Sequence, residues 1–199
     1  MPKGIPLTEE EQQRRRSEIF DASVHLILKK GFKATSMREI AEAAGVGKST
    51  LYDYFKSKDE ILISYFEDAI QELTDRAQEI IDQDLDISEK LRKILEMHLA
   101  YLIDNKNFYL QLTTEIQALS LGSQKQIQIK RYAYQDMLGA LIEEGSNSGV
   151  FRPVNSLFAS RSIFMMLSLA IFTSRPDTLG TPDEMMEEAI TIFFEGIQA

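Results

Sequence analysis

The stretch TSMREIAEAAGVGKSTLYDYFKSKDEIL, Thr35–Leu62, has the pattern of two short helices joined by a tight turn. The first helix carries an apolar face that includes Ile40 and ends before Gly45, where glycine adopts a left-handed backbone at no steric cost. In the second helix, Leu51 and Phe55 are four residues apart and therefore lie on one side. The pattern predicts a helix-turn-helix, whose second helix enters the major groove of DNA.

The segment GVGKST, Gly45–Thr50, also resembles the end of a phosphate-binding P-loop. That loop needs a first glycine five residues before its Gly-Lys pair, and position 42 is Glu, a carboxylate where phosphate oxygens would lie. A buried strand should precede the loop, whereas MREIAEAA has the spacing of an amphipathic helix. These residues argue against an ATP-hydrolysing enzyme.

Charge divides the chain of 199 residues unevenly. Residues 1–58 hold 11 Lys and Arg against 8 Asp and Glu, a balance of +3, while residues 59–199 hold 11 against 23, a balance of −12, and the two sum to the net charge of −9. A mildly basic head on an acidic body is typical of a DNA-binding module joined to a different domain. We therefore predict a DNA-binding domain over 1–58 and a regulatory domain over 59–199.

Apolar spacing and helix-start signals predict an all-α fold. Capping boxes begin at Thr8, Ser36, Ser57 and Thr181, and Ser88 is expected to cap a further helix. Later helices are expected at about 106–120, 124–144, 155–174 and 182–198, with Gly145–Gly149 and Pro153 in a loop. The longest apolar run, residues 163–172, is too short to cross a bilayer, and there is no cysteine or signal peptide. The expected location is the cytoplasm, with no membrane partner.

The motif GV-x-x-x-T-L-Y-x-Y-F-x-x-K, Gly45–Lys58, resembles the DNA-binding signature of the TetR family of bacterial transcriptional regulators. The resemblance extends from about Ile19 to Leu62 and is only architectural beyond that point. It implies three N-terminal helices with a helix-turn-helix and a long connecting helix. It also implies a C-terminal domain, from about residue 85, that binds an effector and forms dimers.

The resemblance also implies roles for individual residues of the DNA-binding segment. Residues at base-reading positions are Lys48, Thr50 and Arg38, and a lysine at such a position prefers guanine. Residues at phosphate-contacting positions are Thr35, Ser36, Ser49, Tyr52, Tyr54 and Lys58. Gly47 stands where other members carry a side chain, so no base contact is expected there. The run Arg14–Arg16 is either a solvated helix face or a further phosphate contact.

The last two predicted helices are apolar around most of their circumference, so each must be covered on two faces. One face can pack on the domain core and the other on a second subunit in a two-fold four-helix interface. The alternative is a monomer with a thick core. The residues predicted at the dimer interface are Phe164, Leu167, Ile171, Ile190, Phe193, Phe194 and Ile197.

The sequence points to an effector only through scattered side chains of the acidic body. The candidates for lining a ligand pocket are His98, Tyr101, Tyr109, Gln111, Thr114, Gln117, Arg161 and Met165. His98 lies on an apolar helix face, where it is either a hydrogen-bonded core residue or a ligand contact. No spacing suggests a catalytic triad, a metal site or a cofactor, so a non-enzyme is expected.

Two functions remain open at this point. The first is a repressor that binds an inverted-repeat operator in double-stranded DNA as a homodimer and is released by a small apolar or amphipathic effector. The second is a DNA-bound interaction protein whose acidic body contacts another protein.

Overall fold

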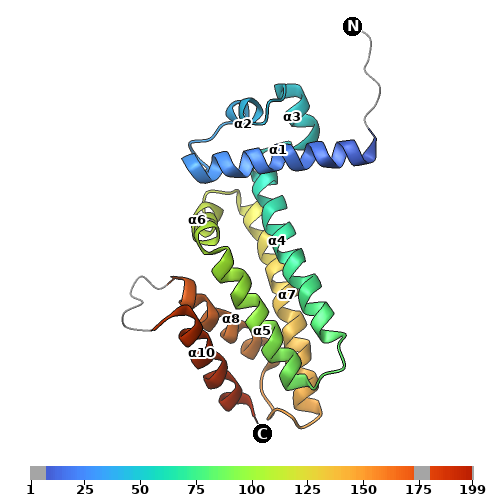
Figure 1. Ribbon diagram of the computed structural model, residues 1–199, viewed down its shortest axis with the longest axis vertical. Helices are drawn as coiled ribbons and strands as arrows, with labels where there is room; N and C mark the ends of the chain where they lie inside the picture. Colours follow the sequence, from blue (N-terminus) through green and yellow to red (C-terminus); the bar gives the residue numbers. More distant parts are fainter. Residues whose placement is uncertain (1–7, 173–179, 199) are drawn as a thin grey trace. The chain divides into compact units, whose positions relative to one another are not determined.

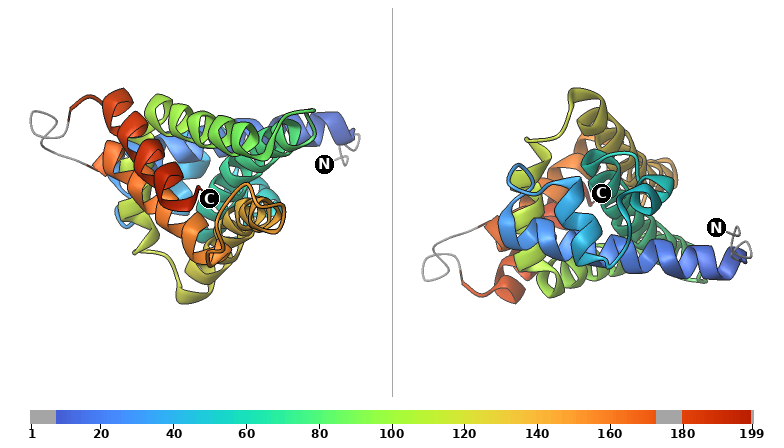
Figure 2. Two further views of the ribbon diagram at one scale, coloured as in Figure 1. Left: turned by 90° about the horizontal axis from the view of Figure 1, so that it is seen from below. Right: turned by 90° about the horizontal axis from the view of Figure 1, so that it is seen from above.

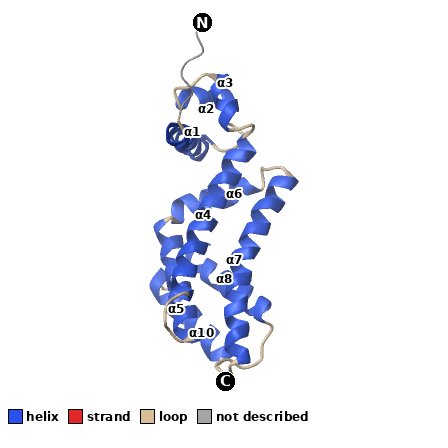
Figure 3. Ribbon diagram, turned by 90° about the vertical axis from the view of Figure 1, so that its right-hand side faces the viewer, coloured by secondary structure: helices blue, strands red, loops and turns tan. Residues whose placement is uncertain are grey.

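A computed structural model describes residues 8–172 and 180–198, with the backbone alone at a few helical positions. These residues are almost entirely helical, which confirms the all-α prediction, and short loops join the helices (Figures 1 and 3). The helices are α1 Glu9–Lys30, α2 Met37–Ala43, α3 Lys48–Tyr54, α4 Lys58–Ile81, α5 Ile87–Asp104, α6 Lys106–Ile116, α7 Leu121–Asn147, α8 Ser156–Phe172 and α10 Pro182–Ile197.

The helix starts follow the predicted capping chemistry with two exceptions, at Ser88 and Ser57. Complete capping boxes are present at Thr8, Ser36 and Thr181, where hydroxyl and carboxylate satisfy backbone N–H groups that have no helical partner. The predicted cap at Ser88 is wrong, because α5 begins two residues earlier. The carboxylate of Asp86 accepts from the backbone N–H of Glu89 at 2.8 Å and takes that role.

At Ser57 the box is incomplete. The Ser57 hydroxyl accepts from the backbone N–H of Glu60 at 3.1 Å, but the Glu60 carboxylate accepts from the backbone N–H of Lys56. The first turn of α4 is therefore still closed by side chains, one residue away from the predicted arrangement.

The expected loop over Gly145–Gly149 begins later than predicted, because α7 continues to Asn147. Gly145 lies within that helix, in close contact with Phe151. A Cβ atom at position 145 would lie 2.3 Å from Cδ2 of the buried Phe151 ring. Gly145 is thus a packing residue inside a helix, and the left-handed glycine of the loop is Gly149, with φ 80°.

The chain divides into two compact units, Met1–Phe66 with Gln111–Gln126 and Glu67–Leu110 with Ile127–Ala199. Helices α4, α6 and α7 each contribute residues to both units. The first unit buries apolar residues from α1 to the start of α4: Ile19, Val24, Ile27, Phe32, Ile40, Leu51, Phe55, Ile61 and Leu62.

The second unit has a larger core, in which α10 packs on α8 and α5, as the end views in Figure 2 show. Its buried residues come from α4, α5, α7, α8 and α10, among them Leu73, Leu91, Leu95, Leu138, Ile142, Ile163, Leu167, Ile190 and Phe194. Phe151 and Gln198 form an isolated β-bridge, and the backbone N–H of Arg152 donates to the carbonyl of Ile197 at 2.8 Å. These contacts hold the end of α10 against the segment that precedes α8.

Candidate nucleic-acid interface

Helices α2 and α3 form the predicted helix-turn-helix. Gly45 has φ 63°, and the backbone N–H of Val46 donates to the carbonyl of Ala41 at 2.9 Å, which closes the turn. Leu51 and Phe55 are fully buried on the inner side of α3. The opposite side of α3 therefore faces outward.

That outer side carries polar and aromatic residues. Lys48, Ser49 and Tyr52 are exposed, while Thr50 and Tyr54 are half-buried. The ammonium of Lys48 lies 5.9 Å from the centroid of the Tyr52 ring. These five residues supply donors of the kind that contact base edges and phosphates in a major groove.

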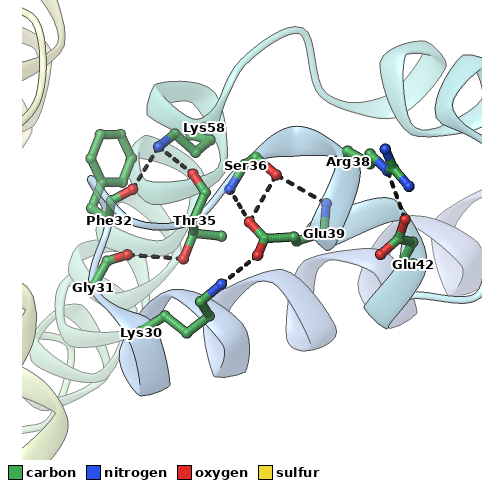
Figure 4. A network of polar contacts seen from close by, with 9 residues as sticks. All are labelled: Lys30, Gly31, Phe32, Thr35, Ser36, Arg38, Glu39, Glu42 and Lys58. Atoms are coloured by element: carbon green, nitrogen blue, oxygen red, sulfur yellow. Dashed lines mark hydrogen bonds and ion pairs between the residues drawn. The ribbon is translucent and has the colours of Figure 1, made fainter.

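Arg38 lies on the exposed surface of α2, where its guanidinium forms an ion pair with Glu42 at 2.9 Å (Figure 4). The two residues are one helical turn apart, and both side chains are more than half exposed. An exposed pair of this kind contributes little to stability, so Arg38 can exchange Glu42 for DNA at small cost.

Ser36 and Glu39 form a tight polar group at the start of α2. The hydroxyl of Ser36 donates to Glu39 at 2.8 Å, and the ammonium of Lys30 also contacts the same carboxylate (Figure 4). Hydrogen bonds from Lys30 and then Ser36 lower the pKa of Glu39 to about 2. The group ties the end of α1 to the first turn of α2.

The structure gives Thr35 an internal role in place of the predicted phosphate contact. Its side chain is buried, its hydroxyl donates to the carbonyl of Gly31 at 2.9 Å, and its backbone N–H donates to Phe32. The short side chain is therefore used to shape the turn between α1 and α2. Sequence spacing alone could not distinguish this inward orientation from an outward one.

Lys58 is also held inside the first unit. Its ammonium donates to the carbonyls of Phe32 and Thr35 and lies 4.5 Å from the centroid of the Phe32 ring (Figure 4). An ammonium has three N–H donors, so one remains for a phosphate. Lys58 thus connects the start of α4 to the turn before α2.

The arginines of α1 have different surroundings. Arg14 and Arg15 pair with Glu18 on the helix surface, which agrees with a solvated face. Arg16 instead lies 4.8 Å from the centroid of the Phe55 ring and donates to the hydroxyl of Ser64 at 3.1 Å. Its guanidinium therefore helps to position the end of α3.

Sequence reasoning missed a second polar group in this unit. Oδ2 of Asp59, in the first turn of α4, accepts from the backbone N–H of Ser120 at 2.9 Å and from the hydroxyl of Ser123 at 2.8 Å. The partners are 61 and 64 positions apart, so no local pattern could indicate the contact.

In the second unit, His98 is a buried core residue. Its Nδ1 lies 3.3 Å from the hydroxyl of Tyr134, and its ring meets that of Phe164 edge to face with centroids 4.7 Å apart. Burial lowers the pKa of His98 to about 3 and raises that of the Tyr134 phenol. Both groups are therefore neutral near pH 7.

The remaining residues predicted for a ligand pocket lie in three places. Tyr101 and Tyr109 are partly buried against the apolar clusters of the second unit, and burial raises the pKa of each. Thr114 and Gln117 belong to the first unit, where they line an open hollow of about 380 Å³ together with Lys30–Ala34. The side chain of Gln111 lies outside the described residues.

Arg161 and Met165, the last two members of that set, lie on the outer surface of α8. Arg161 forms an ion pair with Asp136 at 2.9 Å, and its guanidinium lies over the Tyr132 ring. Met165 is 72% exposed. Within the second unit, Met165 therefore faces outward, whereas His98 lies in the buried core.

The residues predicted at the dimer interface face the inside of the second unit. Phe164, Leu167 and Ile190 are at most 5% exposed, and Phe193, Phe194 and Ile197 are also buried. The side chain of Ile171 lies outside the described residues. Within a single chain α8 and α10 turn these side chains toward the core, which periodicity cannot distinguish from the outer face when a helix is apolar all round.

Neither of two other kinds of site is found in the described ranges. Over 8–172 and 180–198, no three His, Asp or Glu side chains are grouped so that they could hold a metal ion. None of the helices described there is long and apolar enough to cross a membrane.

Comparisons with known proteins agree with this arrangement. The profile of "Bacterial regulatory proteins, tetR family" matches residues 19–65, and that of "Tetracyclin repressor-like, C-terminal domain" matches residues 84–197. The chain is 30% identical to a fatty acid metabolism regulator protein of Bacillus subtilis over 132 residues, which are 66% of this chain and 68% of the relative. It is 24% identical to the HTH-type transcriptional repressor KstR2 of Rhodococcus jostii, over 92% of this chain and 91% of the relative.

Among solved structures, FadR of Bacillus subtilis in complex with stearoyl-CoA superposes with a TM-score of 0.77 at 26% identity. The superposition covers 92% of this chain and 99% of the other. The two profile matches cover both the helix-turn-helix and the C-terminal helices. The chain belongs to the TetR family of bacterial regulatory proteins and is a DNA-binding transcriptional regulator.

Proposed function

We propose that the protein is a repressor that binds an inverted-repeat operator as a homodimer and is released by a fatty acyl effector. The outward face of α3 supports the DNA-binding part most directly, because Lys48, Ser49 and Tyr52 are exposed there while Leu51 and Phe55 anchor the helix. Lys48, Thr50 and Arg38 would read bases. Ser36, Ser49, Tyr52, Tyr54 and the free N–H of Lys58 would contact phosphates.

A dimer that presents two such helices to one face of DNA needs half-sites separated by about 34–36 Å or a multiple of that distance. Binding to phosphates releases counterions, so affinity should fall steeply as the salt concentration rises. Selection of bound sequences from a random pool tests this part. Enrichment of single, unpaired half-sites would contradict a dimeric repressor.

The dimer surface that we propose is the outer face of α8 and α10, not the inner face named from the sequence. Exposed apolar residues gather on these two helices: Leu157, Phe158, Met165, Leu169 and Ile192. The first three also line an open groove of about 630 Å³ with Arg161. Apolar side chains exposed together on a protein surface are typical of a contact with another protein.

Arg161 adds a polar argument for the same surface. Its Nε atom is buried without a hydrogen-bond partner in the single chain, although its Nη2 contacts Asp136. A buried unpaired donor is costly, and a second subunit could supply the acceptor. A second copy of the same surface is therefore the occupant that we favour.

Sedimentation of a Phe158→Asp variant tests the interface. Phe158 is 72% exposed, so the substitution should leave the fold intact while placing two charges in the contact. Leu121→Asp, at an 84% exposed leucine of α7 outside this surface, is the matched control. Dimers of unchanged stability in the Phe158→Asp protein would exclude this surface.

The effector proposal rests on two relatives: a fatty acid metabolism regulator and a FadR structure that contains stearoyl-CoA. Within this chain, the apolar cluster of Leu99 and Leu102 is bordered by partly buried Tyr109, Met185 and Met186. Methionine side chains adapt to ligands of irregular shape, and an acyl chain needs an apolar lining.

Fluorescence anisotropy of labelled operator with and without stearoyl-CoA tests the effector. We expect the acyl-CoA to weaken operator binding, and coenzyme A without an acyl chain to have no effect. If no acyl-CoA changes operator affinity, the effector proposal fails. In that case a pull-down can test the interaction-protein alternative. A partner protein captured by wild type but not by Phe158→Asp would favour it.

A further inference from the structure

Two adjacent residues at the start of α4 hold different parts of the first unit. Lys58 donates to the carbonyls of Phe32 and Thr35, in the turn that leads into the helix-turn-helix. The next residue, Asp59, accepts from Ser120 and Ser123, where α7 begins. One helical turn therefore contacts both the DNA-binding segment and the turn between α6 and α7.

The Asp59 contact is built as a helix cap. The hydroxyl of Ser120 accepts from the backbone N–H of Ser123 at 3.2 Å, while Asp59 takes the backbone N–H of Ser120 itself. A carboxylate at a helix N-terminus also interacts favourably with the partial positive charge there. Ser120, Ser123 and Asp59 thus close the first turn of α7 together.

The surroundings indicate that Asp59 is charged in this contact. Partial burial of Asp59 opposes its ionisation, but the hydrogen bonds from Ser120 and Ser123 outweigh that effect, and the pKa of the carboxyl is lowered. Ser123 is only 8% exposed, so its hydroxyl is committed to the group and not to solvent.

The same unit contains a second meeting point of these segments. One open hollow is lined by Lys30–Ala34, which lead from the end of α1 toward α2, and by four residues at and just after the end of α6: Thr114, Glu115, Gln117 and Ala118. Helices α6 and α7 continue from this unit into the second unit. A change in the α6–α7 turn would therefore act on the first unit at two places, one of which is the hydrogen-bonded contact of Asp59 with Ser120 and Ser123.

We infer that Asp59 is a positioning residue that couples the helix-turn-helix to the α6–α7 turn, so that displacement of this turn changes the placement of α3. The inference rests on the proposed function, because the displacement is attributed to the effector. It requires no contact of Asp59 with DNA or with the effector.

The test compares Asp59→Ala with wild-type protein in operator titrations with and without stearoyl-CoA. Wild type should show a coupling of about tenfold or more, within the range common for allosteric proteins. In Asp59→Ala the ratio of the two operator dissociation constants should approach one, while stearoyl-CoA binds the free protein as in wild type. Asp75→Ala, which removes an exposed carboxylate from the same helix, should keep the wild-type ratio.

Two further variants separate coupling from a loss of folding. Ser123→Ala removes one donor and should reduce the ratio less than Asp59→Ala does. Asp59→Asn retains an acceptor oxygen and should restore part of the ratio. A wild-type ratio in folded Asp59→Ala would overturn the inference.

Hydrogen exchange keeps the inference testable if stearoyl-CoA has no effect on wild type, which would be a failure of the proposed effector alone. The backbone N–H of Ser120 should then exchange more slowly when operator is bound to wild type, and operator should not slow it in Asp59→Ala. Equal protection of Ser120 by operator in both proteins would overturn the coupling role of Asp59.

Discussion

The outer face of α3 and the surroundings of His98 use polar groups in opposite ways. On α3, Lys48 and Ser49 project from a short helix that is anchored by buried apolar residues on its other side. In the second unit, His98 and Tyr134 satisfy each other inside an apolar core next to Phe164. The first arrangement leaves donors available to a large polar partner, whereas the second suits an environment without charge.

This difference explains why the exposed face of α3 can be predicted from the sequence and the surroundings of His98 cannot. A protruding recognition surface depends on residues within one turn of each other, so its pattern is local. A core site combines helices that are far apart in sequence, so its members cannot be recognised from spacing. Four experiments test whether the two regions differ in this way.

Truncation of a core leucine should have the largest effect. Leu138→Ala, at a fully buried position of α7, should lower the free energy of unfolding by about 2–5 kcal/mol. Leu121→Ala on the same helix, where the leucine is 84% exposed, should change it by less than about 0.5 kcal/mol. Urea unfolding measures both, and equal losses would mean that the second unit is not packed around Leu138.

Acid should destabilise the protein through His98. The folded-state pKa of about 3 lies below the ordinary value of 6.5, so between these values the unfolded chain binds a proton that the folded chain does not. The contribution of His98 to the free energy of unfolding should be fully present above pH 6.5. Below that pH the free energy of unfolding should fall by up to about 1.4 kcal/mol per pH unit. Unfolding of wild type and His98→Gln at pH 7, 6 and 5 measures this contribution.

The control for that titration is His25→Gln, which removes the exposed histidine of α1. The free energy of unfolding of His25→Gln should depend on pH as that of wild type does, whereas the free energy of unfolding of His98→Gln should change less with pH. If both variants follow wild type, His98 is not neutral in the folded core.

Two lysines of the first unit should respond differently to truncation. Lys48→Ala should relax base preference by about 1–3 kcal/mol and leave stability unchanged, because its ammonium faces outward. Lys58→Ala should lower stability by about 1.5–3 kcal/mol, because its ammonium holds two carbonyls. Operator selection and urea unfolding distinguish these effects. Weaker DNA binding in Lys58→Ala without any loss of stability would identify Lys58 as a phosphate contact only.

Removal of one hydroxyl should have the smallest effect. Tyr52→Phe should weaken binding to all operator sequences alike, by about 0.5–1.5 kcal/mol, since a phosphate contact carries no sequence information. Tyr132→Phe, at an exposed tyrosine of α7, is the control and should bind as wild type. A change in the preferred sequence with Tyr52→Phe would move this residue to the base-reading group.

Local chemistry in the sequence was enough to predict the helical fold, the helix-turn-helix and most helix starts. Ser36 and Thr181 cap their helices through residues three positions away, and Gly45 takes its left-handed conformation within a single turn. The exposed side of α3 follows from the spacing of Leu51 and Phe55 alone. Such features depend on neighbours along the chain, so periodicity and capping rules can predict them.

Tertiary packing decided the direction and partners of the other side chains. Ile190 and Ile192 are two residues apart on an apolar helix, yet only the fold makes the first fully buried and the second 52% exposed. Asp59 meets Ser120 only because α4 and α7 begin close together in the first unit. Burial and long-range hydrogen bonds arise from elements brought together in space, and no spacing within one helix contains that information.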